Sequence, residues 1–205
     1  MNKSDMYSKL KTCPIVAILR GIQLEESVAI CQALADGGIK LIEITMNSPR
    51  AIESIKLVVN HFENKDVEIG AGTVLTPEEV KAVADAGGKY IISPNCNPAV
   101  IQKTKELGLL SLPGVFTVSE AFIALDAGAD FLKLFPAGRL PPEYIKDIKA
   151  VVPADFLAVG GVSPENLNDY LQYTVGAGIG SALYKAGLSM EEIKANAQKL
   201  LKLVR

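Results

Sequence analysis

One lysine lies within an otherwise apolar segment, "ADFLKLFPAG", which spans residues 129–138. Two leucines and two phenylalanines surround Lys133, so the segment has the composition of a buried strand. An amine held in such surroundings binds its proton less tightly, and a neutral amine can attack a carbonyl carbon. The alternative is that the strand ends at the surface and the Lys133 side chain extends into solvent.

Two further charged residues occur in or directly after short apolar segments. Glu43 lies within "LIEIT", where an unpaired carboxylate is costly to bury. It therefore indicates either general acid/base chemistry or a buried ion pair with Lys133. Arg20 follows "PIVAIL", where it either binds a substrate or only caps the rim of the sheet. Thr73 follows "VEIGAG".

Two glycine-containing segments suggest where an anion would bind. "AVGGVSPEN" (158–166) and "GAGIGSALY" (176–184) each place glycines between an apolar run and an expected helix start. Glycine lets backbone N–H groups approach an anion, and a helix N-terminus favours negative charge. Either segment alone is explained by a tight turn, but the two together predict a phosphate site.

These residues belong to a regular alternation of short apolar runs and segments of helical period. Such a repeat, with strands apolar on both faces, predicts a single (β/α)8 barrel domain over residues 1–205 with a short N-terminal helical segment. An open, doubly wound sheet is the competing architecture, but "GAGTVL" (70–75) lacks the third glycine of a dinucleotide fingerprint. In a barrel, Arg20, Glu43 and Lys133 meet at the C-terminal ends of the strands. The predicted strands are 14–19, 40–45, 67–72, 89–93, 109–113, 130–135, 155–160 and 173–180.

Local signals place several helix boundaries. Thr76 and Ser163 each precede a proline, as a capping residue precedes a first-turn proline, and both predict helix starts. Four glycines predict helix ends in the left-handed conformation: Gly37, Gly87, Gly108 and Gly128.

Composition excludes several classes of function. The net charge is −2 and no basic run occurs, so we expect no nucleic-acid partner. No apolar stretch reaches membrane-spanning length and no signal-peptide pattern is present, so we expect a cytoplasmic protein without a membrane partner. Three widely spaced cysteines predict reduced thiols. His61 is the only histidine, so we expect no metal site and no other cofactor, with proton transfer left to Lys, Glu or Asp.

The chain resembles the 2-keto-3-deoxy-6-phosphogluconate and 2-keto-3-deoxy-6-phosphogalactonate aldolases, class I lyases with a (β/α)8 fold, over nearly its whole length. The similarity is carried jointly by "IVAILRG", "LIEIT", "IGAGTVL", "ISPN", "LPGVFTVSEA", "LKLFPAG", "AVGGVSPEN" and "GIGSALY". It implies that Lys133 forms a Schiff base with a phosphorylated keto-deoxy sugar acid, that Glu43 is the general acid/base, and that the protein is a homotrimer. The substrate-binding residues that it implies are Arg20 for the carboxylate, Thr73 and Pro94 at the pyruvate end, Phe135 and Val159 beside the sugar acid, and Gly160, Gly161, Gly180 and Ser181 for the phosphate.

Two positions bear on which sugar acid is cleaved. Many gluconate enzymes of this family carry arginine four residues after the glutamate, where this chain has Asn47, so Arg20 resembles the substitute found in galactonate relatives. Gluconate enzymes also commonly have threonine where this chain has Val159, which cannot donate a hydrogen bond. The galactonate phosphate is therefore the expected substrate. The gluconate phosphate or 4-hydroxy-2-oxoglutarate is the alternative, and an isomerase, an epimerase or a non-catalytic sugar-phosphate binder is a more distant one.

Overall fold

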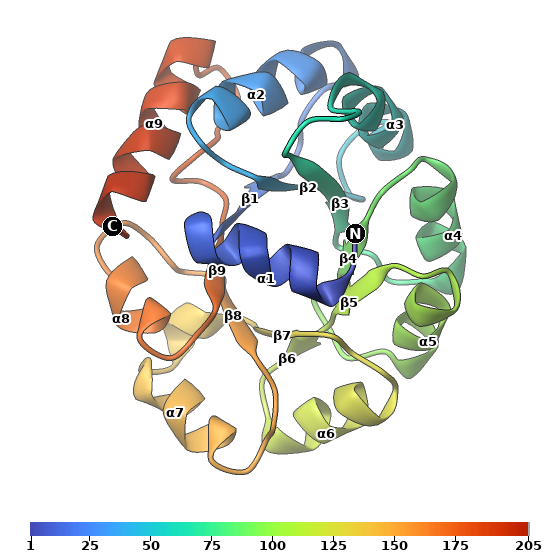
Figure 1. Ribbon diagram of the computed structural model, residues 1–205, viewed down its shortest axis with the longest axis vertical. Coiled ribbons are helices and arrows are strands. Elements are labelled where there is room, and N and C mark those ends of the chain that lie inside the picture. Colours follow the sequence, from blue (N-terminus) through green and yellow to red (C-terminus); the bar gives the residue numbers. More distant parts are fainter. Residues whose placement is uncertain (205) are drawn as a thin grey trace.

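The computed structural model describes residues 1–204, and its strands form one parallel sheet wrapped into a barrel (Figure 1). Neighbours follow the order β5-β4-β3-β2-β1-β9-β8-β7-β6. The predicted (β/α)8 barrel is confirmed, and the open doubly wound sheet is wrong. The strands are β1 (Ile15–Leu19), β2 (Leu41–Thr45), β3 (Glu68–Gly72), β4 (Tyr90–Ile92), β5 (Leu110–Leu112), β6 (Gly114–Val115), β7 (Leu132–Leu134), β8 (Phe156–Val159) and β9 (Gly176–Ile179).

Strands β5 and β6 are two halves of one strand of the barrel. Only Pro113, which has no N–H to give to a ladder, separates them. β5 pairs with β4, whereas β6 pairs with β7, and the Pro113 carbonyl accepts a hydrogen bond from the Lys133 N–H at 2.9 Å. The two half-strands together close the ring between β4 and β7. The second half ends at Val115, two residues beyond the strand end predicted at 113.

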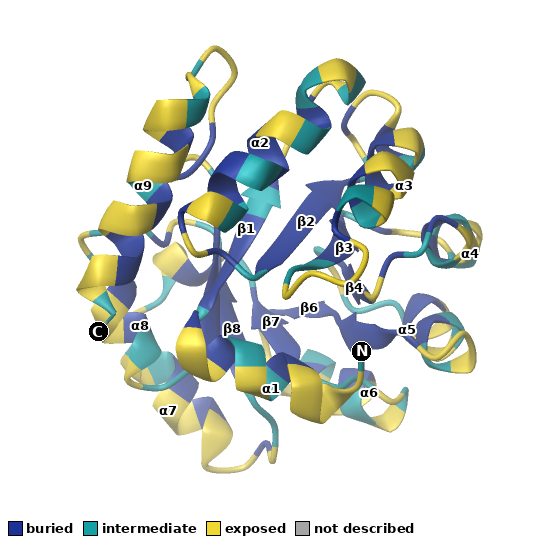
Figure 2. Cartoon of the chain, turned by 45° about the horizontal axis from the view of Figure 1, so that its top comes forward, coloured by how far each residue is buried: buried dark blue, intermediate teal, exposed yellow. Residues whose placement is uncertain are grey.

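Helices surround the barrel and turn their exposed faces outward, while the strands are buried (Figure 2). Across residues 1–204, every helix is too short or too polar to cross a lipid bilayer. The helices are α1 (Lys3–Thr12), α2 (Leu24–Asp36), α3 (Ala51–His61), α4 (Pro77–Asp85), α5 (Pro98–Glu106), α6 (Val118–Asp126), α7 (Glu143–Lys149), α8 (Leu167–Leu171) and α9 (Met190–Leu203), with a short 3-10 helix at Ala137–Arg139.

One of the two predicted helix starts is correct. Thr76 caps α4, its hydroxyl accepting from the Glu79 N–H at 3.2 Å. Ser163 does not cap α8, because the chain first makes a turn in which Asn166 accepts from the Ser163 N–H at 2.8 Å.

Three of the four predicted helix-end glycines, Gly87, Gly108 and Gly128, adopt positive φ. Gly37 does not, with φ of −77°; the next residue, Gly38, takes the left-handed conformation at +100°.

A separate apolar cluster fills the barrel interior, and α1 closes one end of it. We call it the inner cluster; it comprises Met6, Leu10, Val16, Leu41, Tyr90, Ile92, Leu110, Leu112, Phe131, Leu157 and Val159. Met6 and Leu10 come from α1, which lies across the ring in Figure 1. The Tyr7 ring centroid lies 5.0 Å from that of Phe131, just before β7, so α1 covers the N-terminal ends of the strands. The polar site residues therefore lie at the opposite end, where the strands have their C-termini.

Candidate active site

A cavity of about 600 Å³ lies at the C-terminal ends of the barrel strands. β1, β2, β7, β8, β9 and the segments that follow them supply its walls. Every predicted site residue except Thr73 and Pro94 lines this cavity: Arg20, Glu43, Lys133, Phe135, Val159, Gly160, Gly161, Gly180 and Ser181.

Lys133 lies on the inner face of β7, and only 6% of its surface is exposed. Its Nζ lies 4.6 Å from the centroid of the Phe135 ring. This cation–π contact stabilises the charged amine less than the water that burial removes. The alternative in which this side chain extends into bulk solvent is therefore wrong.

Glu43 lies on the inner face of β2 and is 2% exposed. Its carboxylate lies beside Gly72 on β3, where the Cβ of any other residue would overlap it. Among residues 1–204 its Oε2 has no hydrogen-bond partner, and no ion pair within 4.0 Å joins it to Lys133 or Arg20. Lys133 and Glu43 therefore share a cavity without forming the buried ion pair that the sequence left open.

Burial drives both groups toward their neutral forms. Desolvation lowers the pKa of Lys133; the Glu43 carboxylate opposes this and the Arg20 guanidinium adds to it. Desolvation raises the pKa of Glu43 to about 7, against the opposing effect of Lys133 and Arg20. Near neutral pH a small change in the surroundings is enough to move a proton on or off Glu43. That is the property required of a group that acts alternately as acid and base.

The loop after β8 brings backbone into the cavity. Gly160 and Gly161 have φ of +86° and +79°, a region unfavourable for other residues. A Cβ on Gly160 would lie 2.9 Å from the Phe135 ring, and the Gly160 carbonyl accepts from the Gly138 N–H at 2.8 Å. Glycine is thus required here by both conformation and space.

After β9 the chain forms a single turn at the cavity wall. The Gly180 carbonyl accepts from the N–H groups of Leu183 and Tyr184 at 2.9 and 3.0 Å, so the turn does not use the N–H groups of Ser181 and Ala182. Neither glycine loop leads directly into a helix, since α8 begins at Leu167 and α9 at Met190. The expected helix N-termini at these loops are therefore wrong, and backbone N–H groups of the loops themselves are what an anion would meet.

Three polar residues of the cavity were not predicted: Ser163, Tyr184 and Lys185. Tyr184 donates a hydrogen bond to Glu26 Oε1 at 3.0 Å, and burial together with this carboxylate raises the pKa of Tyr184 to about 12. Lys185 directly follows "GSALY", so a basic residue beside a glycine loop was the available signal. Ser163 was interpreted as a helix cap.

Thr73 and Pro94 lie at the ends of β3 and β4, outside the cavity lining. Thr73 has φ of +58°, a conformation that is rare for a β-branched residue and is associated with functional sites. A Cβ on Gly114 would overlap the Pro94 carbonyl, so this part of the rim is tightly packed. A substrate-binding role for both stays a prediction.

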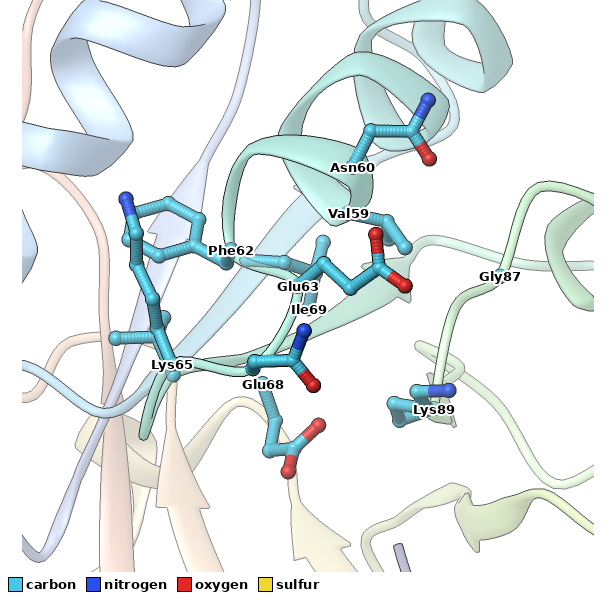
Figure 3. Close-up of a pocket in the computed structure, with 11 residues that line it drawn as sticks. Val59, Asn60, Phe62, Glu63, Lys65, Glu68, Ile69, Gly87 and Lys89 are labelled. Carbon is cyan, nitrogen blue, oxygen red and sulfur yellow. The ribbon is translucent and has the colours of Figure 1, made fainter.

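A second cavity, of about 410 Å³, lies at the opposite end of the barrel near the start of β3 (Figure 3). The carboxylates of Glu63 and Glu68 point away from each other there, and none of the predicted site residues lines it. Within residues 1–204, no group of three or more His, Cys, Asp or Glu side chains is placed to hold a metal ion. Of these two cavities, the first is the one that brings the predicted charged residues together.

Comparison with known proteins agrees with this geometry. Residues 6–200 match the family model "KDPG and KHG aldolase". The chain is 45% identical to 2-dehydro-3-deoxy-6-phosphogalactonate aldolase of Escherichia coli K12, over 94% of this chain and 95% of that protein. It superposes on "Native KDPGal structure" with a TM-score of 0.90 and 44% identity, over 93% and 94% of the two chains. It also superposes on KDPG aldolase from Legionella pneumophila, solved with pyruvate captured at low pH as a covalent carbinolamine intermediate, with a TM-score of 0.82 and 28% identity, over 99% and 96% of the chains.

Replacing Arg20 with alanine is expected to raise the pKa of Glu43 above its value of about 7, because the guanidinium stabilises the ionised carboxylate. Carboxyl carbon NMR on protein labelled at glutamate follows the titration, with Glu43→Gln to assign the signal. Lys185→Ala is the control, since this lysine lines the cavity but is not among the charges that act on Glu43. An unchanged midpoint in Arg20→Ala contradicts the proposed electrostatics.

Proposed function

Because the chain belongs to the KDPG and KHG aldolase family, we propose that it cleaves 2-dehydro-3-deoxy-6-phosphogalactonate to pyruvate and D-glyceraldehyde 3-phosphate through a Schiff base on Lys133. The observation that carries the proposal is the pair of buried groups at one cavity: an amine 6% exposed and a carboxyl 2% exposed, with no ion pair within 4.0 Å between them in the described chain. Phosphate binding alone requires neither.

Lys133 supplies the covalent step. Its neutral amine adds to the C2 ketone to give a carbinolamine, which takes up a proton and loses water to give a protonated imine. When the C3–C4 bond breaks, its electron pair moves into this cation and leaves an enamine. The barrel interior favours the start of this sequence, because burial lowers the pKa of Lys133 and increases the fraction of amine that is neutral.

Glu43 moves the protons. As a carboxylate it removes the proton of the C4 hydroxyl, so that C4 leaves as the aldehyde of glyceraldehyde 3-phosphate. As a carboxylic acid it then returns that proton to C3 of the enamine, and water hydrolyses the resulting imine to pyruvate and free Lys133. A pKa of about 7 populates both forms at neutral pH.

The remaining cavity residues hold the two ends of the substrate. Arg20 is the cation available for the carboxylate, with Thr73 and Pro94 at the pyruvate end. The loops that contain Gly160, Gly161, Gly180 and Ser181 offer backbone N–H groups and a hydroxyl for the phosphate. The Phe135 ring lies between the two ends of the site, because it contacts both the Lys133 amine and Gly160.

Val159 supports the galactonate epimer. It is 4% exposed and lines the cavity immediately before the glycine pair, yet it cannot bond a substrate hydroxyl. Asn47, at the position where many gluconate enzymes have arginine, is exposed and does not line the cavity. 2-Dehydro-3-deoxy-6-phosphogluconate and 4-hydroxy-2-oxoglutarate are the alternative substrates for the same mechanism.

The proposal extends to the setting of the enzyme: a cytoplasmic homotrimer that uses no cofactor. Val118, Phe122 and Ile123 on α6 are 38%, 42% and 48% exposed, which supports contact with another copy at this helix.

Replacing Lys133 with alanine is expected to reduce cleavage to background while the fold is retained, because no other amine of residues 1–204 lies buried at the cavity. Pyruvate with borohydride must add the mass of a reduced adduct at Lys133 in the wild type and in Lys185→Ala, but nothing in Lys133→Ala. Glu43→Gln should still form the adduct and turn over about 10²- to 10⁴-fold more slowly. Cleavage by Lys133→Ala at the wild-type rate would exclude the imine mechanism, and ligand stabilisation without pyruvate release would indicate a binding protein.

Introducing a hydroxyl at position 159 tests the epimer preference. The wild type is expected to have a higher kcat/KM for the galactonate than for the gluconate substrate. Val159→Thr should reduce this ratio by about 3- to 10-fold, the effect of one neutral hydrogen bond to the C4 hydroxyl. Val162→Thr adds the same hydroxyl elsewhere in the cavity and serves as the control. Equal changes in the two variants would mean that Val159 does not select the epimer.

A further inference from the structure

Tyr90 is a buried polar residue of the barrel interior for which the reaction above has no role. It lies on β4 within the inner cluster and is 0% exposed. Its hydroxyl and Glu43 Oε2 are both buried, and within residues 1–204 neither has a hydrogen-bond partner. A buried hydroxyl without a partner costs free energy, so its presence calls for an explanation.

The sheet register places Tyr90 and Glu43 on either side of β3. Glu43 is paired with Gly70, and the ladder between β3 and β4 pairs Ala71 with Ile91, which sets Tyr90 opposite Gly70. Residues at matching positions of neighbouring parallel strands point to the same face of the sheet. Both side chains therefore project into the barrel, with β3 between them.

Two glycines on β3 leave room for the side chains to approach each other. A Cβ on Gly70 would overlap the Tyr90 ring, so the ring lies across β3 toward β2. A Cβ on Gly72 would overlap the Glu43 carboxyl, which therefore lies one step higher, toward the cavity. The Tyr90 ring thus lies over Gly70, one inward-facing position before the Gly72 that the Glu43 carboxyl faces, and the two side chains are neighbours across β3.

The electrostatic environment keeps Tyr90 a donor. Burial raises the pKa of Tyr90 well above its ordinary value, and the carboxylates of Glu43 and Glu68 act in the same direction. The charged groups that face Glu43 from other elements are Lys133 and Arg20. The phenol is therefore protonated wherever Glu43 titrates.

We propose that Tyr90 is a positioning residue for Glu43: its hydroxyl donates to Oε2 through one internal water, or directly after a small movement of either side chain, and holds Oε1 toward the substrate. The proposal rests on the function proposed for Glu43. A hydrogen bond donated to an ionised group stabilises its ionised form over its neutral form. Tyr90 therefore favours the carboxylate of Glu43, which accepts the C4 hydroxyl proton. If the Tyr90 ring only filled space, phenylalanine at this position would fill it equally well and would leave no buried hydroxyl without a partner.

Tyr90→Phe tests the proposal because it removes one oxygen and keeps the ring. We expect kcat to fall at least 10-fold with KM nearly unchanged, the cost of one hydrogen bond to a charged group. The acidic limb of the pH profile of kcat should shift to higher pH, because ionised Glu43 loses a donor. Tyr144→Phe is the control: its hydroxyl bonds the Phe116 carbonyl at 2.8 Å, and its loss should leave the limb in place.

Two further measurements separate the possible outcomes. In a Glu43→Gln background, Tyr90→Phe should have little additional effect; effects that simply multiply would overturn the proposal. A high-resolution crystal structure should show Tyr90 Oη bonded to Oε2 or to a water that it shares with Oε2; a bond to another group would overturn it independently of variant stability. If the wild type forms no pyruvate adduct, the proposed function fails, whereas an adduct with wild-type kcat and pH profile in Tyr90→Phe overturns the role of Tyr90 alone.

Discussion

The cost of burying a charge is the constraint on which this structure depends. Lys133 and Glu43 are removed from water by a closed ring of strands, and the described chain provides neither with an ion pair within 4.0 Å. The same burial lowers the pKa of the amine and raises that of the carboxyl, so the two shifts have one cause. Arg20, which is exposed at the rim, favours a neutral Lys133 but an ionised Glu43. It thereby favours the protonation states with which a retro-aldol cleavage begins.

The barrel provides this environment through a closed end, a filled interior and a few glycines. α1 closes the N-terminal end with Met6 and Leu10, and the inner cluster fills the middle. Glycines then determine where polar groups fit: Gly72 accommodates the Glu43 carboxyl, Gly70 the Tyr90 ring, and Gly160 the Phe135 ring. Much of the site is thus specified by residues that have no side chain.

The sequence predicted the elements of this fold where a local signal was sufficient. Apolar runs identified the strands, and their alternation placed Lys133 and Glu43 on the inner face. The errors occurred where neighbouring residues compete for one role. Gly38 rather than Gly37 adopts the left-handed conformation after α2, and Asn166 rather than Ser163 organises the start of α8. Pro113 interrupts a strand only in its hydrogen bonding, which a run of apolar residues cannot reveal.

Within the site, contacts between distant segments were the part that sequence patterns could not supply. Tyr184 lines the cavity, and its hydroxyl bonds Glu26, which is 158 residues away. The proposed role of Tyr90 depends on the register across β3 and on the room that Gly70 leaves for the Tyr90 ring. Thr73 and Pro94 were predicted from the resemblance, and they lie at the strand ends without lining the cavity.

The central claim is that the amine of Lys133 binds its proton less tightly than an ordinary lysine. The most direct measurement is an NMR titration of isotopically labelled lysine side chains, with the Lys133 signal assigned by its absence in Lys133→Ala. Our account predicts a midpoint for Lys133 clearly below that of the surface lysines. A Lys133 signal that titrates with them near ~10.4 would contradict it.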